Sequence, residues 1–221
     1  MNEAKKTLAK ITDKQVDNAW LRGAIQAVPY VGSTLDTWTF QFSEEKKRKR
    51  LEELLTELAK AVDKLEIDVK HIENNIEEYG YLFERVATLT TQDYREEMRT
   101  AYRTLFAKFM SKEFSGEDNK EIYLQTLSSM TPMHIVALRV FSESVNDNGK
   151  LKVQPEEKKA FIEKLVESGI EETIADTLIN DLVTRGLILH SQSSVIGGDV
   201  HNYAIAEMGI TMLLLISAEE N

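Results

Sequence analysis

Residues 177–190 read TLINDLVTRGLILH, and this stretch indicates a helix, its end and the start of a strand. Leu178 and Leu182 stand four positions apart, as on the buried face of a helix, and Gly186 follows where helices commonly end. LILH then begins an apolar strand, and VHNYAI at 200–205 supplies a second one. Glycines at 197 and 198 lie in the loop between them, so we expect a β-hairpin.

Helices are expected on both sides of this hairpin. Thr131 and Pro132 predict the N-cap and first residue of one helix, and Pro155 and Gly169 the start and end of the next. NDNG at 146–149 predicts a turn, and KLKV at 150–153 a short strand. A third helix is expected over 171–185, and AEMGITMLLLISAEE at 206–220 as a packed closing helix. The first helix is expected to turn Ile135, Leu138 and Phe141 inward, and the third to bury Ile174, Leu178 and Leu182. The apolar residues of the second helix are Phe161, Ile162 and Leu165.

This order of three helices, a hairpin and a closing helix resembles the winged-helix fold. LVTRGLI at 182–188 and YAIAEMGITMLLLI at 203–216 are similar to the recognition-helix end and the post-wing segment of bacterial winged-helix proteins. The resemblance covers about ninety residues and concerns shape. In many members of that family the helix corresponding to 171–185 enters the DNA major groove, so the resemblance implies a DNA-binding transcriptional regulator.

The charge of that helix argues against nucleic acid as a partner. Glu171, Glu172, Asp176 and Asp181 oppose Arg185 alone, which gives residues 171–185 a net charge of −3. Residues 131–221 hold seven basic and fourteen acidic side chains. DNA binding normally places Lys or Arg against phosphates, so these acids would be repelled. We therefore expect a protein-interaction module with the four acids on its partner surface.

The leucine-rich stretch 51–86 is expected to form one continuous helix with a buried seam. Its apolar residues alternate spacings of four and three, namely Leu51, Leu55, Leu58, Val62, Leu65, Val69, Ile72, Ile76, Tyr79, Phe83 and Val86. Such a seam needs a partner helix, and Thr91 predicts the N-cap of one. Its apolar stripe is expected to be Tyr94, Met98, Ala101, Leu105 and Phe109. An antiparallel hairpin within the chain is the first interpretation, and an intermolecular coiled coil is the alternative.

The first fifty residues are basic, with a net charge of +4, whereas the remaining residues sum to −14. Segment 19–42, AWLRGAIQAVPYVGSTLDTWTFQF, predicts two short apolar helices with a bend at 29–32. Trp20 and Trp38 bracket this segment, and the bases Lys46, Lys47, Arg48, Lys49 and Arg50 follow it. Aromatic ends with a polybasic flank are typical of contact with lipid or another anion at a membrane surface. The alternative is docking on the protein's own core or on a partner, with KKRKR as a solvated first helical turn.

The front half also carries a resemblance of its own. VPYVGSTLDTW at 28–38, followed by basic residues and a leucine-rich helix, resembles uncharacterised bacterial proteins linked to mobile elements or phage defence.

No pattern in the sequence predicts catalysis, a cofactor or a metal. The chain contains no cysteine, which excludes disulfides and thiolate chemistry and suits a reducing cytosol. No secretory signal or spanning apolar run is present, so a cytoplasmic protein, peripheral at the membrane under the lipid interpretation, is expected. His190 and His201 could face each other across the hairpin, but a metal there would need a third ligand such as Asp199. An exposed histidine pair is the preferred interpretation.

The sequence thus predicts a mainly α protein, with a long coiled-coil-like helical hairpin followed by a winged-helix-like α+β domain. The expected domains are a basic segment at 1–50, a helical bundle at 51–130 and the winged-helix-like domain at 131–221. The expected function is non-enzymatic assembly or interaction with a protein partner or a second copy. The alternatives are a membrane-active effector using 19–42 and a winged-helix transcriptional regulator.

Overall fold

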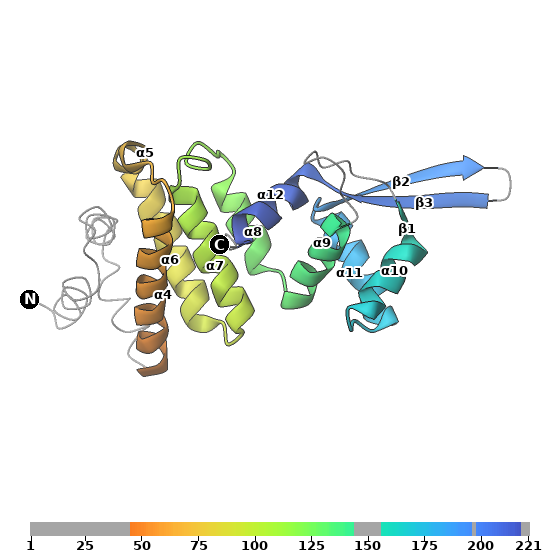
Figure 1. Cartoon of the computed structure of the whole chain (residues 1–221), viewed down its shortest axis with the longest axis horizontal. Coiled ribbons are helices and arrows are strands. Elements are labelled where there is room, and N and C mark those ends of the chain that lie inside the picture. Colours follow the sequence, from red (N-terminus) through yellow and green to blue (C-terminus); the bar gives the residue numbers. More distant parts are fainter. Residues whose placement is uncertain (1–44, 144–155, 196–197, 218–221) are drawn as a thin grey trace, which may run out of the picture. The chain divides into compact units, whose positions relative to one another are not determined.

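The structure, a computed structural model, describes residues 45–143, 156–195 and 198–217 of the chain (Figure 1). These residues are mostly helical, which confirms the mainly α class predicted from the sequence. They belong to two compact units. Unit 1 consists of the chain up to Ser128 together with the residues from Ile216 onward, and unit 2 spans Ser129–Leu215. Segment 19–42, with Trp20 and Trp38, and the turn and strand predicted over 146–153 lie outside the described residues.

Unit 1 consists, over its described residues, of helices packed side by side (Figure 1). In chain order they are α4 (Glu45–Lys64), α5 (Val69–Asn74), α6 (Ile76–Gln92), α7 (Glu96–Met110) and α8 (Lys120–Ser128). Arg50 Nη1, near the start of α4, donates to the Thr91 carbonyl near the end of α6 over 2.8 Å, so these two helices are antiparallel. The Tyr79 hydroxyl, near the start of α6, donates to the Phe109 carbonyl near the end of α7 over 2.9 Å, so α7 reverses direction again.

The continuous helix predicted over 51–86 is wrong, because the chain leaves helix after Lys64 and re-enters it at Val69. The seam is nevertheless buried in large part. Leu55 and Leu58 of α4 and Val86 of α6 are each 0% exposed. Because α4 packs against α6 and α7, the first half of the seam has the second half as a neighbour.

Backbone pairing holds the chain extended between α4 and α5. Glu66 accepts the Lys112 N–H over 2.8 Å, and the Asp68 N–H donates to the Met110 carbonyl over 3.0 Å. The Asp68 carboxylate then accepts the His71 N–H over 3.0 Å and caps α5. The alternation of apolar and acidic residues in LEIDV at 65–69 is a period-two pattern that favours extended chain.

The predicted start of the second hairpin helix is also wrong. Thr91 lies in the last turn of α6, where its hydroxyl donates to the Ala87 carbonyl over 2.7 Å, and it does not cap α7. Tyr94, expected in the buried stripe, lies in the turn before α7 and is 80% exposed. The remaining stripe residues, Met98, Ala101, Leu105 and Phe109, are buried as predicted.

Unit 2 combines helices with one small antiparallel sheet. In chain order its elements are α9 (Pro132–Glu143), β1 (Glu156–Glu157), α10 (Lys158–Glu167), α11 (Glu172–Thr184), β2 (Ile188–Val195), β3 (Gly198–Ile205) and α12 (Glu207–Ile216). The strands lie in the order β1-β3-β2, and Figure 1 shows β2 and β3 as a long hairpin. Gly169 and Gly186, at φ +86° and +71°, end α10 and α11 as predicted. Gly209 of α12 lies so close to Leu187 that a Cβ would overlap its carbonyl oxygen.

Two expectations for unit 2 are corrected. The helix expected from Pro155 begins at Lys158, because Glu156 and Glu157 pair with β3 and keep the chain extended. Ile174 is 36% exposed instead of buried. The buried face of α11 is formed by Ala175, Leu178, Ile179 and Leu182, which leaves Ile174 at its edge.

Candidate functional site

The four acids predicted as a partner surface differ in their surroundings. Glu171 and Glu172, at the start of α11, are exposed. Asp176 forms an ion pair with Lys158 of α10 and accepts from Asn180 over 3.2 Å. Asp176 therefore links two helices of unit 2, and Glu171 and Glu172 are the acids presented most openly to solvent.

Asp181 is the centre of a polar cluster between α9 and α11. Its Oδ2 lies 2.7 Å from His134 Nε2 and accepts from Arg185 Nε over 2.8 Å. Arg185 also donates to the hydroxyl and the carbonyl of Ser129. The Arg185 guanidinium, with the His134 ring, holds the pKa of Asp181 below its usual value against the opposing effect of partial burial. The single base of residues 171–185 is thus bound inside unit 2.

His134 resembles the centre of a catalytic triad but acts as a helix cap. Its Nδ1 lies 2.8 Å from the Thr131 hydroxyl and accepts the Thr131 N–H over 3.0 Å. An acceptor at Nδ1 leaves the proton on Nε2, which donates to Asp181. His134 is 8% exposed, so it is buried between these partners. The bond from the Thr131 N–H is one half of a capping box, with histidine at the third helical position, and burial lowers the pKa of this ring.

Sequence reasoning missed this cluster, although Thr131 and His134 have the spacing of a capping box. The third member could not be read from the sequence, because Asp181 lies 47 positions from His134.

The outward face of α11 carries neutral polar side chains. Exposed residues recur at spacings of four, three and four, namely Thr173, Thr177, Asn180 and Thr184. The Thr177 and Thr184 hydroxyls donate to carbonyls one turn back, over 3.1 and 2.9 Å. Beside Glu172, an open hollow of about 660 Å³ lies between α10 and α11, with Ile162 and Val166 in its lining. This face thus offers hydroxyls, an amide, carboxylates and a little apolar surface.

The histidine pair of the hairpin lies as the sequence suggested. His190 Nε2 and His201 Nδ1 are 2.9 Å apart, and both residues are exposed. The ring planes differ by 11° and the centroids are 5.2 Å apart, so the rings meet edge to edge. One of these two nitrogens therefore donates a hydrogen bond to the lone pair of the other. The two nitrogens face each other, so their lone pairs do not point to a common metal position. The Asp199 side chain lies outside those described, and the described residues contain no group of three or more metal-ligating side chains.

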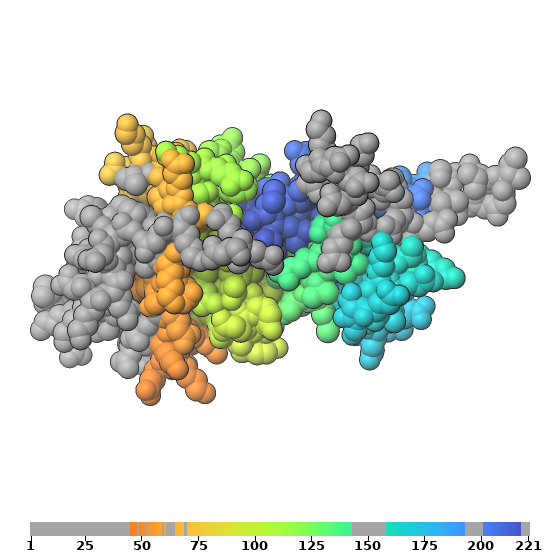
Figure 2. Space-filling view, viewed as in Figure 1, coloured from red at the N-terminus to blue at the C-terminus, as the bar shows by residue number. Residues whose placement is uncertain are grey.

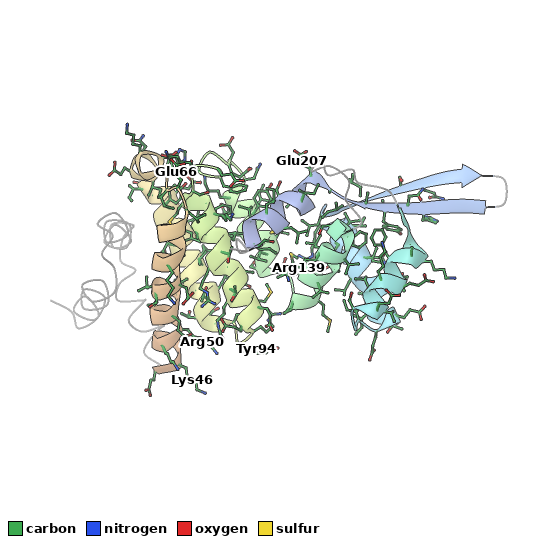
Figure 3. All side chains as sticks on the ribbon, in the orientation of Figure 1. Lys46, Arg50, Glu66, Tyr94, Arg139 and Glu207 are labelled. Atoms are coloured by element: carbon green, nitrogen blue, oxygen red, sulfur yellow. The ribbon has the colours of Figure 1, made fainter. Side chains whose placement is uncertain are left out.

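The bases predicted to contact lipid or another anion lie in the first turns of α4. Lys46 and Lys49 are exposed, Lys47 is half-buried, and the Arg48 side chain lies outside those described. Arg50 holds the end of α6, as its bond to the Thr91 carbonyl shows. Figure 3 shows Lys46, Arg50 and Tyr94 at the same end of the unit 1 helices, and in Figure 2 the start of α4 (orange) projects there. Over the described residues, no helix meets the length and apolarity needed to span a bilayer.

No protein-family model, curated protein or solved structure matches this chain.

Proposed function

We propose that the protein is a non-enzymatic interaction protein whose unit 2, a winged-helix module, binds a protein partner through α11. The order of helices, hairpin and closing helix supports the winged-helix assignment. In that assignment α11 takes the position of the helix that enters the DNA groove in DNA-binding members.

The observation that carries this proposal is the state of Arg185. A DNA-binding helix needs bases that reach phosphates or base edges, and Arg185 is the one basic residue between 171 and 185. Its guanidinium is held by Asp181 and Ser129. The exposed side chains of α11 are therefore neutral or acidic, and a phosphate row would be repelled at Glu171 and Glu172.

The same side chains suit a protein surface. Threonine and asparagine at regular helical spacing supply hydrogen bonds, and the edge residue Ile174 supplies apolar contact. Glu171 and Glu172 at one end favour a partner that carries Lys or Arg at the matching position. The partner class is thus a protein with a basic patch beside a polar surface.

Charge reversal tests the choice between protein and DNA. Unmodified protein should not shift the anisotropy of a labelled duplex at about 0.15 M salt, where phosphate contacts are already weakened. The double variant Glu171→Lys with Glu172→Lys should bind the duplex in a salt-sensitive manner, at least about ten-fold more tightly than the unmodified protein does. Glu73→Lys with Glu113→Lys, two exposed acids of unit 1, makes the same change in net charge as a control. Tight duplex binding by the unmodified protein would overturn the proposal.

A cross-linking experiment tests the protein partner directly. A photoreactive residue at Thr177, in the middle of the exposed face, should yield a discrete adduct in cells that express the protein. We expect that adduct to be protease-sensitive and nuclease-resistant, and to disappear when Glu171→Lys and Glu172→Lys are added. A nuclease-sensitive adduct at this position would contradict the proposal.

A further inference from the structure

The end of unit 1 where α4 begins carries more bases than acids among its described side chains, and the proposal for α11 does not use it. Over residues 45–50 and 93–103, the described side chains include seven bases and four acids. The chain as a whole has a net charge of −10. The bond from Arg50 to the Thr91 carbonyl joins the start of α4 to the end of α6, and Figure 3 shows Lys46, Arg50 and Tyr94 at this end of the unit. We call it the basic end.

The turn between α6 and α7 is tied down at this end. Asp93 accepts from the N–H, Nε and Nη2 of Arg95 over 2.9, 2.9 and 2.7 Å. Arg99 Nη1 donates to the Asp93 and Tyr94 carbonyls, over 3.3 Å each. The Arg95 guanidinium holds the pKa of Asp93 below its usual value. Because these bonds fix the backbone of the turn, they also fix the direction in which the side chain of its central residue leaves the backbone.

That central side chain is Tyr94, which is 80% exposed. Its ring has the Arg95 guanidinium 5.9 Å from its centroid, and Lys46 lies at the same end of the unit (Figure 3). A tyrosine ring has an apolar body and a polar tip, the combination enriched at membrane interfaces. Lys46 and Lys49, in the first turns of α4, supply exposed positive charge.

We propose that the basic end binds the surface of an anionic membrane, with Tyr94 at the level of the lipid headgroups and Lys46 and Lys49 against lipid phosphates. This inference does not depend on the function proposed for α11. The exposed ring of Tyr94 on a surface that carries exposed bases suits the interface of an anionic bilayer.

Vesicle sedimentation of the full chain tests this proposal. We expect binding to extruded vesicles of phosphatidylcholine with phosphatidylserine, reduced by salt, and little binding to phosphatidylcholine alone. Each base near such a surface contributes about 1 kcal/mol, or about five-fold in the partition coefficient. Lys46→Gln with Lys49→Gln should therefore weaken binding more than ten-fold. Lys70→Gln with Lys112→Gln, exposed bases at the other end of unit 1, makes the same charge change and should have little effect.

A probe at position 94 distinguishes this surface from the rest of the chain. The sequence contains no cysteine, so Tyr94→Cys provides a single attachment point for an environment-sensitive dye. The dye should report an apolar environment with anionic vesicles, whereas the same dye on Lys112→Cys should not. Three results would overturn the proposal: equal loss of binding in both glutamine pairs, vesicle binding with an unchanged signal at position 94, or binding of labelled nucleic acid in place of vesicles.

Discussion

Acidification should destabilise unit 2 through His134. In the folded protein its Nδ1 accepts the Thr131 N–H and its Nε2 lies 2.7 Å from Asp181. A second proton would have to sit on Nδ1, which would deprive the Thr131 N–H of its acceptor. His134 is also 8% exposed, and burial lowers the pKa of its ring from 6.5 more than Asp181 raises it.

The direction of the pH effect follows from these contacts. Below the unfolded pKa of 6.5, the unfolded chain binds a proton at this position that the folded chain resists. The contribution of His134 is therefore complete above that value and declines as the pH falls toward the lower folded pKa. The free energy of unfolding should fall by at most about 1.4 kcal/mol per pH unit in this window.

His134→Gln is the matched variant for this prediction. Glutamine is an ordinary capping-box residue at this helical position, so it can keep the bond to Thr131, and it does not titrate. Urea unfolding, followed through the methyl NMR signals of buried Ile179 and Leu182, reports on unit 2 alone. The difference in stability between the natural protein and the variant should shrink from about pH 7 to about pH 5. Parallel pH profiles, or a His134 ring that titrates at or above 6.5, would refute the reasoning.

Two further predictions concern packing. Leu58→Asp should lower the free energy of unfolding of unit 1 by more than about 4 kcal/mol, because it removes a fully buried side chain and buries a charge. Half-buried Leu65→Asp should cost less than about 2 kcal/mol, and equal melting temperatures by circular dichroism would contradict this. Gly209→Ala should cost about 1–3 kcal/mol, because its Cβ would overlap the Leu187 carbonyl. Gly116→Ala, with open space around it, should change stability by less than about 0.5 kcal/mol in urea unfolding, and equal effects at both glycines would refute the clash.

Helix starts and ends that depend on a single residue could be predicted from the sequence. Pro132 begins α9, and Gly169 and Gly186 adopt the positive φ angles expected after a helix. Each of these residues restricts or frees its own backbone, so its effect does not depend on distant parts of the chain.

The reversal of the chain after α4 could not be predicted from the spacing of apolar residues. A four-three spacing specifies that a face is apolar, but not which helix covers it, and the same spacing continues through the break. The break itself depends on the end of α7, where Met110 pairs with Asp68, and on Lys112 just beyond it, which pairs with Glu66. The alternation in LEIDV was the available local signal, and the longer helical period concealed it.

The candidate site was predictable in composition but not in detail. The acidity of α11 follows from counting its charged residues. The interactions of Asp176 with Lys158 and of Asp181 with His134 could not be predicted in this way, because Lys158 and His134 lie in other elements. Exposure of Tyr94 depends on where α6 ends, a boundary that the spacing of apolar residues left open. The roles predicted for Trp20 and Trp38 stay predictions.

The folding back of the α4–α6 seam has a consequence for self-association. Leu55, Leu58 and Val86 are already covered within one copy, so unit 1 does not offer them to a second chain in its closed form. A dimer built on this seam must exchange helices, with α4 of each copy taking the place of its counterpart in the other. The short segment at 65–68 would serve as the hinge, and the backbone pairs that hold Glu66 and Asp68 to the end of α7 would have to open. Such exchange is limited by the opening of unit 1, so seam-mediated dimers would form slowly and, once formed, persist after dilution.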